Sequence, residues 1–60
     1  MSIKEKREQQ NLTQAELAKA LNIDQSTVCL WETGKTSPRA KLLPKIADLL
    51  RCSVDELLKG

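Results

Sequence analysis

The residues with the clearest potential for chemistry lie in the segment IDQSTVCLWE, residues 23–32. At about 100° per residue, a helix over this segment places Val28 and Trp31 on one face. The opposite face carries Gln25, Ser26, Cys29 and Leu30. An amide can make two hydrogen bonds to adenine, a hydroxyl can donate or accept, and an apolar side chain can contact the thymine methyl group. This face therefore suits a DNA major groove, although a solvent-exposed helix with a stray leucine is the plainer interpretation.

Trp31 is the only aromatic residue of the chain, and two interpretations compete for it. It shares a helix face with Val28, which favours a role as the anchor of the hydrophobic core. Stacking on a nucleobase is the alternative role for an aromatic side chain beside nucleic acid. We expect the core role, because the polar residues of the same helix lie on the other face.

A basic cluster follows this segment. Between Glu32 and Asp48 the chain carries Lys35, Arg39, Lys41 and Lys45, with no acidic residue among them. The formal net charge of the chain is only +2, which does not identify a partner by itself. Taken alone, the cluster is either a solvated loop and helix face or a surface that meets a partner.

The sequence lacks the residue sets that catalysis and metal binding use. It has no histidine, no carboxylate pair in a plausible cleft and no glycine-rich loop for phosphates. Cys29 and Cys52 lie far apart without a CxxC pattern, which argues against a zinc site and a disulfide scaffold. We therefore expect no enzyme activity, no cofactor and no metal. Oxidation of Cys29 could alter binding by its helix face, but an inert small side chain is the ordinary interpretation.

Length and composition predict one all-α domain over residues 1–60. Leucine, isoleucine and alanine are ample, glycine and proline are few, and phenylalanine and tyrosine are absent. No stretch resembles a secretory signal peptide, and no apolar run approaches the roughly 20 residues of a membrane span. We expect a cytoplasmic protein without membrane association.

Repeated capping patterns predict where the helices begin. Capping boxes of the form S/T-x-x-E start at Ser2, Thr13 and Ser53, and Asp24 is a further predicted cap. In such a box the hydroxyl accepts from the backbone N–H three residues later, and the glutamate accepts from the N–H of the cap. Hydrophobic staples support these starts, in the pairs Leu12 with Leu17, Ile23 with Val28, and Cys52 with Leu57.

The predicted helix ends agree with these starts. Asn11 and Asn22 each follow a helical stretch, and asparagine tolerates the left-handed conformation that ends many helices. Arg51 holds the equivalent place, where a bulky side chain is less comfortable. Together the signals predict a compact bundle of five short helices, over residues 2–10, 13–21, 24–32, 40–50 and 53–59. Pro44 lies inside the fourth range, where it either starts a shorter helix or kinks a longer one.

Residues 13–34, TQAELAKALNIDQSTVCLWETG, resemble the helix-turn-helix of the lambda repressor and Cro family, also called the XRE family. The resemblance covers nearly the whole chain. It rests on the Thr-Gln start, the Leu-Ala of the first motif helix, the Gln-Ser-Thr-Val run, the Trp-Glu-x-Gly close and the late SVDELL segment. It implies a lambda repressor-like DNA-binding domain, with the motif at about residues 13–33 and the recognition helix at about 24–32.

The resemblance also implies roles for individual residues. The base-contacting set would be Gln25, Ser26, Cys29 and Leu30. The phosphate-contacting set would be Gln14, Thr27, Lys35, Thr36 and Arg39. Arg7 and Glu32 match a pair that forms an internal salt bridge in this family, the alternative being two unrelated surface charges. Ala18 stands where the two motif helices cross, and Asn22 holds the place of the usual turn glycine.

Four positions depart from the family pattern. Leu30 stands where arginine or another polar residue is common, which removes a possible guanine contact and favours thymine methyl groups. Lys6 occupies a place that is usually apolar, so the first helix is expected to dock through Ile3 and the aliphatic stem of Lys6. Arg51 replaces a glycine, and Pro44 makes the fourth helix irregular.

The resemblance implies a sequence-specific, double-stranded DNA-binding transcriptional regulator, with repression as the expected sign. Such a protein would bind an inverted-repeat operator as a homodimer. The alternative from another class is a protein-interaction module on the same fold, such as an antitoxin or an adaptor that has lost DNA binding. The exposed Leu30 supports that alternative, and salt-dependent binding to random duplex would separate the two.

Overall fold

Helices make up most of residues 1–59, which is the part of the chain that the computed structural model describes. They are α1 (Ile3–Gln9), α2 (Gln14–Leu21), α3 (Gln25–Glu32), the 3-10 helix η1 (Ala40–Leu42), α4 (Leu43–Leu49) and α5 (Val54–Leu58). These residues contain no strand, so the all-α class and the five-helix bundle are confirmed. Except in the fourth helix, each helix begins one residue after its predicted start, because the cap lies outside the hydrogen-bonded helix.

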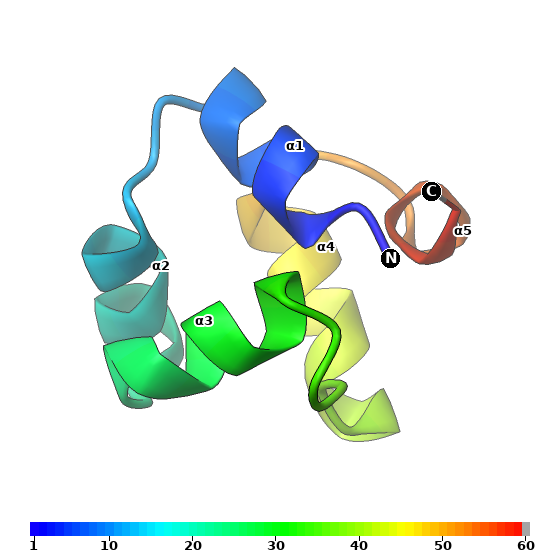
Figure 1. Ribbon diagram of the computed structural model, residues 1–60. Helices are drawn as coiled ribbons and strands as arrows, with labels where there is room; N and C mark the ends of the chain where they lie inside the picture. The colour runs from blue at the N-terminus through cyan, green and yellow to red at the C-terminus, as the bar shows by residue number, and fades with distance from the viewer. Residues whose placement is uncertain (60) are drawn as a thin grey trace.

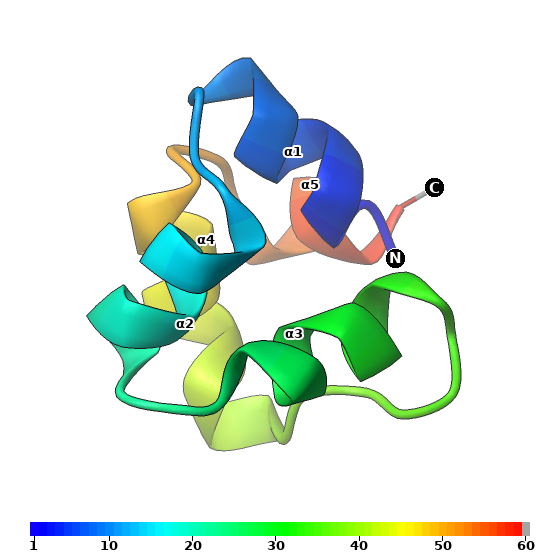
Figure 2. The same ribbon diagram turned by 60° about the vertical axis from the view of Figure 1, so that its left-hand side comes forward.

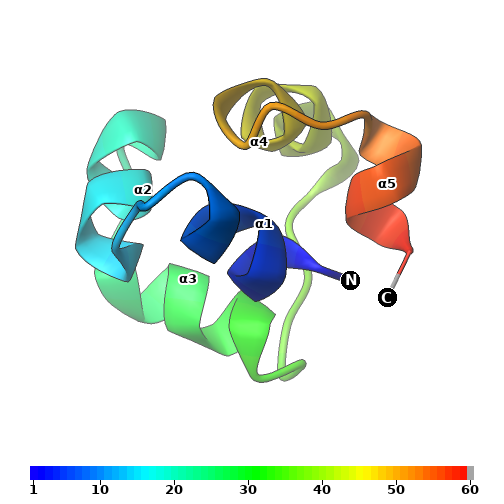
Figure 3. The same ribbon diagram turned by 90° about the horizontal axis from the view of Figure 1, so that it is seen from above.

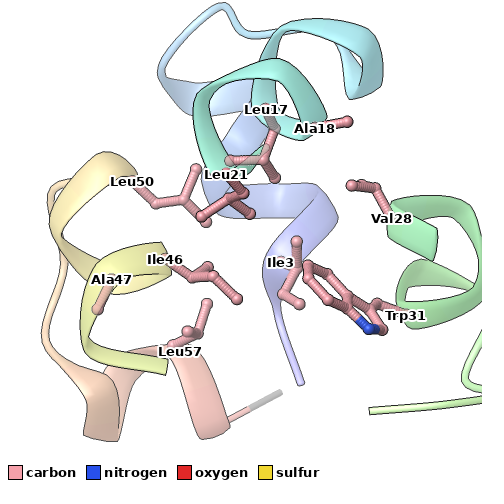
Figure 4. Close-up of a cluster of buried hydrophobic side chains, with 10 residues drawn as sticks. All are labelled: Ile3, Leu17, Ala18, Leu21, Val28, Trp31, Ile46, Ala47, Leu50 and Leu57. Atoms are coloured by element: carbon pink, nitrogen blue, oxygen red, sulfur yellow. The ribbon is translucent and has the colours of Figure 1, made fainter. Parts of the chain in front are cut away.

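The helices are arranged around one hydrophobic core. Figures 1 and 3 show α2 and α3 side by side at one side of the molecule and α5 at the other, with α1 and α4 between them. Figure 2 shows the N-terminal end of the chain beside α5. Figure 4 shows side chains from all five α-helices meeting in the interior, where the buried apolar residues are Ile3, Leu17, Ala18, Leu21, Val28, Trp31, Ile46, Ala47, Leu50 and Leu57.

Two of the predicted capping boxes are confirmed. The backbone N–H of Glu16 donates to Oγ1 of Thr13 at 3.0 Å, and the N–H of Thr13 donates to Oε1 of Glu16 at 2.9 Å. The same reciprocal pair joins Ser53 and Glu56, at 3.1 Å in each direction. The backbone hydrogen bond from the cap lowers the pKa of both glutamates. Each box thus satisfies two N–H groups that a helix start would otherwise leave unpaired.

Ser2 and Asp24 also occupy the N-cap positions of α1 and α3, but the side-chain cap bonds predicted for them are wrong. Ser2 makes no side-chain cap; its hydroxyl donates to the carbonyl of Glu56 at 3.1 Å, and its N–H donates to the carbonyl of Leu57 at 2.9 Å. The buried Ser2 therefore satisfies the last carbonyls of α5 instead of the first N–H groups of α1. Asp24 precedes α3 in an extended conformation but makes no side-chain cap. The N–H of Thr27, which its carboxylate would accept, donates to the backbone carbonyl of Asp24 at 3.0 Å.

Three helices end through the same left-handed residue geometry. Asn11 and Asn22 have φ of 58°, as predicted, and Arg51 adopts φ of 55° despite its bulk. In each case the next residue donates its N–H to a carbonyl five residues earlier, at 2.9–3.1 Å, which is the bond that closes a helix C-terminus. Those next residues, Leu12, Ile23 and Cys52, pack partly buried against the core. At all three turns, the residue that closes the helix end with its backbone N–H is therefore also the residue predicted to begin the hydrophobic staple of the next helix.

The fourth helix differs from the predicted range of 40–50. Its first turn is η1, in which the N–H of Leu42 donates to the carbonyl of Arg39 at 2.9 Å, and α4 begins only at Leu43. Pro44 lies in the first turn of α4, where a missing N–H leaves no helical hydrogen bond unmade. The shorter-helix alternative is therefore the correct one.

Helix α1 docks on the core through Ile3 and Lys6, as expected from the lysine at a position that is usually apolar in the family. Ile3 is buried in the core, while the Lys6 side chain is 23% exposed and places its Nζ 3.9 Å from Glu56. An arginine completes the docked face, because Arg7 is also buried. This docking brings α1 against the end of α3 and so positions the charged network described below.

Candidate nucleic-acid interface

The two faces of α3 are separated as the sequence predicts. Val28 is 0% exposed and Trp31 is 8% exposed, and Figure 4 shows both side chains directed into the core. The core role of Trp31 is therefore confirmed. The opposite face is exposed and carries Gln25, Ser26, Cys29 and Leu30. The structure thus brings the predicted base-contacting residues together on one surface, and their contact with bases stays a prediction.

The loop after α3 presents free positive charge next to this surface. Gly34 turns the chain with φ of 81°, and the N–H of Lys35 donates to the carbonyl of Leu30 at 3.0 Å, which ties the loop to the helix end. Lys35, Thr36 and Arg39 are exposed. Within residues 1–59, the Lys35 and Arg39 side chains make no hydrogen bond or ion pair. Both charges are therefore available to an anionic partner.

A groove of about 550 Å³ lies between α3 and this loop. Its lining combines apolar side chains with hydroxyls and one guanidinium, from Ile23, Thr27, Trp31, Thr36, Ser37, Pro38, Arg39 and Leu42. Thr27, which is half-buried, therefore lies near Thr36 and Arg39, with which the resemblance groups it. Ser37 also lines the groove, a position that the sequence does not indicate because it depends on the path of the loop. The groove gathers three of the five expected phosphate-contacting residues.

A buried ion pair joins α1 to the last residue of α3. Nε of Arg7 donates to Oε2 of Glu32 at 2.8 Å, and Nη2 donates to Oε1 at 3.1 Å. The two side chains are only 10% and 4% exposed. The remaining Nη1 donates to the carbonyl of Leu12 at 2.7 Å. The structure thus contains the internal salt bridge that the resemblance implies, in the paired geometry that is strongest for arginine and a carboxylate.

Gln14 joins this network through a contact that the sequence did not predict. Its Nε2 donates to Oε1 of Glu32 at 3.0 Å, so the first residue of α2 and the last residue of α3 are directly linked. The Glu32 carboxylate therefore accepts three hydrogen bonds. Gln14 stays a predicted phosphate-contacting residue, but its amide nitrogen already donates one hydrogen bond to Glu32.

The network makes stability depend on the charge of Glu32. Burial alone would raise the pKa of Glu32, but the hydrogen bonds from Arg7 and Gln14 and the charge of Arg7 outweigh it, so its pKa lies below the ordinary value of 4.5. A carboxyl with a lowered folded pKa contributes stability above its unfolded pKa and loses it as pH falls through the folded pKa.

We therefore expect the urea midpoint of unfolding to be constant near neutral pH and to fall as pH drops below about 4.5. Glu16 and Glu56, whose pKa values are also lowered, act in the same direction. Urea titrations from pH 7 to pH 3 measure the effect. A double variant, Glu16→Gln with Glu56→Gln, isolates the contribution of Glu32, and a flat profile in that variant would contradict its role.

The remaining chemically reactive groups form no further site in residues 1–59. Cys29 is exposed and Cys52 is half-buried, and both are free thiols. No group of three or more histidine, cysteine, aspartate or glutamate residues in this part of the chain could hold a metal ion. Among the same residues, no helix has the length and apolar character needed to cross a membrane.

Comparison with known proteins gives consistent relatives. A helix-turn-helix family model matches residues 3–57. The chain is 38% identical over 50 residues to the HTH-type transcriptional activator BcrR of Enterococcus faecalis, which covers 83% of this chain and 24% of BcrR. It is 38% identical over 55 residues to an uncharacterized HTH-type transcriptional regulator of Archaeoglobus fulgidus, which covers 92% and 78%. It is 33% identical over 58 residues to repressor protein C2 of Salmonella phage P22, which covers 97% and 27%.

The matches differ in how much of each relative they span. The chain corresponds to about a quarter of BcrR and of C2, but to most of the archaeal protein. No solved structure matches the chain significantly. The family model covers nearly all of the described helices, including both motif helices and the network around Glu32. The chain therefore belongs to the lambda repressor and Cro-like (XRE) family of helix-turn-helix transcriptional regulators.

Proposed function

We propose that this protein is a sequence-specific, double-stranded DNA-binding transcriptional regulator that acts as a repressor. The α3 helix, predicted as residues 24–32, enters the major groove with Gln25, Ser26, Cys29 and Leu30 toward the base edges. An α-helix with its side chains is about 10–12 Å in diameter, which fits a major groove about 12 Å wide. The relatives include both an activator and a repressor, and repression is favoured because the match to repressor protein C2 extends over 97% of this chain, against 83% for the activator BcrR.

One observation carries the proposal: the exposed face of α3 is polar and stands beside free positive charge. Val28 and Trp31 hold the helix to the core from behind, so the outward face is presented on a rigid support. The loop after α3 adds Lys35 and Arg39, and neither charge is used within residues 1–59. In sequence-specific DNA binding, side chains that contact base edges read the sequence, and neighbouring groups that contact phosphates position the protein. The outward face of α3 and the loop that follows it provide both kinds of group.

The phosphate contacts come from residues on both sides of α3. Gln14 lies at the start of α2, while Thr27, Thr36 and Arg39 line the groove beside the loop, and Lys35 precedes it. Charged and polar donors at these places fix the register of the helix without reading sequence. The protein binds as a homodimer to an inverted repeat, with half-sites about one helical turn (~34 Å) apart.

Salt dependence on random duplex DNA tests this proposal. Neutralising about four phosphates should lower affinity about 100-fold between 50 and 200 mM salt. Fluorescence anisotropy with a labelled duplex of random sequence measures it. Binding that does not respond to salt, or no binding at 50 mM salt, would refute DNA binding.

Arg39→Ala should weaken binding to every duplex by a similar factor, because a phosphate contact carries no sequence information. The slope of log affinity against log salt should decrease by about two units, because Arg39 is removed from both protomers of the proposed dimer. Lys59→Ala is the charge-matched control, because Lys59 is the C-cap of α5 and belongs neither to the groove beside α3 nor to the predicted phosphate-contacting residues. Equal losses in both variants would mean that only net charge matters.

Gln25→Ala should change sequence preference instead of overall affinity. The loss should be about 1–3 kcal/mol on the preferred duplex and confined to one position in each half-site, where adenine is replaced by any base without penalty. Binding to a panel of single-base duplex variants measures this. Gln9→Ala, which removes an exposed amide from α1, is the control, and an equal loss on all duplexes for Gln25→Ala would argue against base contact.

The second candidate is a protein-interaction module such as an antitoxin or an adaptor. It is favoured by Leu30, which is 38% exposed on the outward face of α3, where a hydrogen-bonding side chain would suit DNA better. If this candidate were correct, Leu30→Ala would abolish partner binding while duplex binding would be weak and insensitive to salt.

A further inference from the structure

The amide of Gln14 is oriented by a group that cannot donate a hydrogen bond. Oε1 of Glu32 receives Nε2 of Gln14 at 3.0 Å and Nη2 of Arg7 at 3.1 Å. An ionised carboxylate only accepts, so it selects the nitrogen end of the amide and excludes the carbonyl end. The lowered pKa of Glu32 keeps that carboxylate ionised at neutral pH. Gln14 is thus held in one of its two possible amide orientations.

This orientation matters for an anionic partner. The nitrogen of a glutamine amide has two hydrogens, so one can bond to Glu32 while the other stays available. A phosphate oxygen requires a donor and is repelled by a carbonyl oxygen. An amide without a fixed partner presents either end. A fixed donor end removes that ambiguity before the partner arrives, which lowers the ordering cost of binding.

We propose that Glu32 is a positioning residue for DNA, which holds the Gln14 amide with its second N–H toward a backbone phosphate. The inference rests on the proposed function and deepens it. Arg7 takes part at one remove, because it neutralises and fixes the carboxylate that would otherwise repel the phosphate. The buried Arg7–Glu32 pair, which links α1 to α3, therefore orients the side chain of Gln14 in α2 for its contact with the phosphate.

A double-mutant cycle tests this coupling. Gln14→Met keeps the length of the side chain without its donors, and Glu32→Gln keeps the shape of the carboxylate but can present either end of its own amide. Each single variant should lower affinity for a random duplex about fivefold, which is the effect of one hydrogen bond. The double variant should also lose only about fivefold, because both changes remove the same contact.

The cycle separates positioning from a merely structural role. If Glu32 acted on DNA binding independently of Gln14, Gln14→Met would cost the same in both backgrounds and the losses would multiply to about 25-fold. That result would overturn the inference, as would wild-type affinity in Gln14→Met. These failures appear only in variants. Failure of the wild-type protein to bind any duplex would instead refute the proposed function itself, and the inference with it.

A nuclear magnetic resonance measurement on the wild-type protein decides the matter even if Glu32→Gln does not fold. The side-chain amide protons of Gln14 should be separated more widely than those of the exposed Gln9, because only one of them bonds to a carboxylate. Adding duplex should shift the other proton and leave the first in place. Matching shifts for Gln14 and Gln9, or no change on adding a duplex that binds, would overturn the inference.

Discussion

Replacing Glu32 with alanine should leave most of the protein unfolded at 25 °C. Arg7 would keep only its bond to the carbonyl of Leu12 at 2.7 Å, and its buried charge would lose its counter-ion. Removing one partner of a buried ion pair costs about 3–5 kcal/mol. A domain of this size rarely has more than about 3–5 kcal/mol of stability in total. The loss therefore equals most of what holds the fold together.

A thermal melt followed by circular dichroism measures this effect. Glu5→Ala is the matched control, because Glu5 is an exposed glutamate on α1 and should shift the melt little. A Glu32→Ala variant with the parent's melting temperature would show that the bridge contributes nothing to stability. In that case Arg7 and Glu32 would match the family pattern without stabilising the fold of this chain.

Trp31→Ala should be comparably destabilising. Truncating a buried tryptophan costs about 3–5 kcal/mol, because the loss of apolar contact is followed by an unfilled cavity. Trp31 is 8% exposed and packs against the core beside Val28, so neighbouring side chains cannot cover the space cheaply. The expected result is loss of the cooperative urea transition.

The neighbouring Leu30→Ala provides the control for Trp31→Ala. Leu30 is 38% exposed on the opposite face of the same helix, so its stability cost should stay within about 0.5 kcal/mol. Its effect should appear in DNA preference instead, at positions where a thymine methyl is read. The reverse pattern, a stable Trp31→Ala variant that no longer binds duplex, would mean that Trp31 stacks on a base.

Local signals predicted the helices well where the interaction was itself local. The boxes at Thr13 and Ser53 join residues three apart, so they could be inferred without knowing the tertiary structure. The capping box predicted at Ser2 does not form, because the hydroxyl of Ser2 donates to the carbonyls of Glu56 and Leu57, which are far away in the sequence. Asp24 is the N-cap of α3 as predicted, but its carboxylate makes no cap bond, and the N–H of Thr27 donates to the backbone carbonyl of Asp24 instead.

In the candidate site, too, features fixed by local geometry could be predicted, and features fixed by tertiary packing could not. The angular spacing of residues predicted which face of α3 is buried, because helix geometry alone decides it. The Arg7–Glu32 pair was inferred from the family resemblance, not from the residues themselves. The bond from Gln14 to Glu32 was not predicted, since it depends on how α2 crosses α3. The groove beside Trp31 also depends on packing, through the path of the loop from Thr36 to Arg39.

Selection from a pool of random duplex DNA tests whether α3 recognises a specific DNA sequence. An inverted repeat with half-sites about one helical turn (~34 Å) apart should be enriched. Within each half-site, Gln25→Ala should relax the preference at one adenine, while Arg39→Ala should enrich the same sequence more weakly. Absence of any enriched sequence, from a protein shown by circular dichroism to be folded, would contradict sequence-specific recognition by α3.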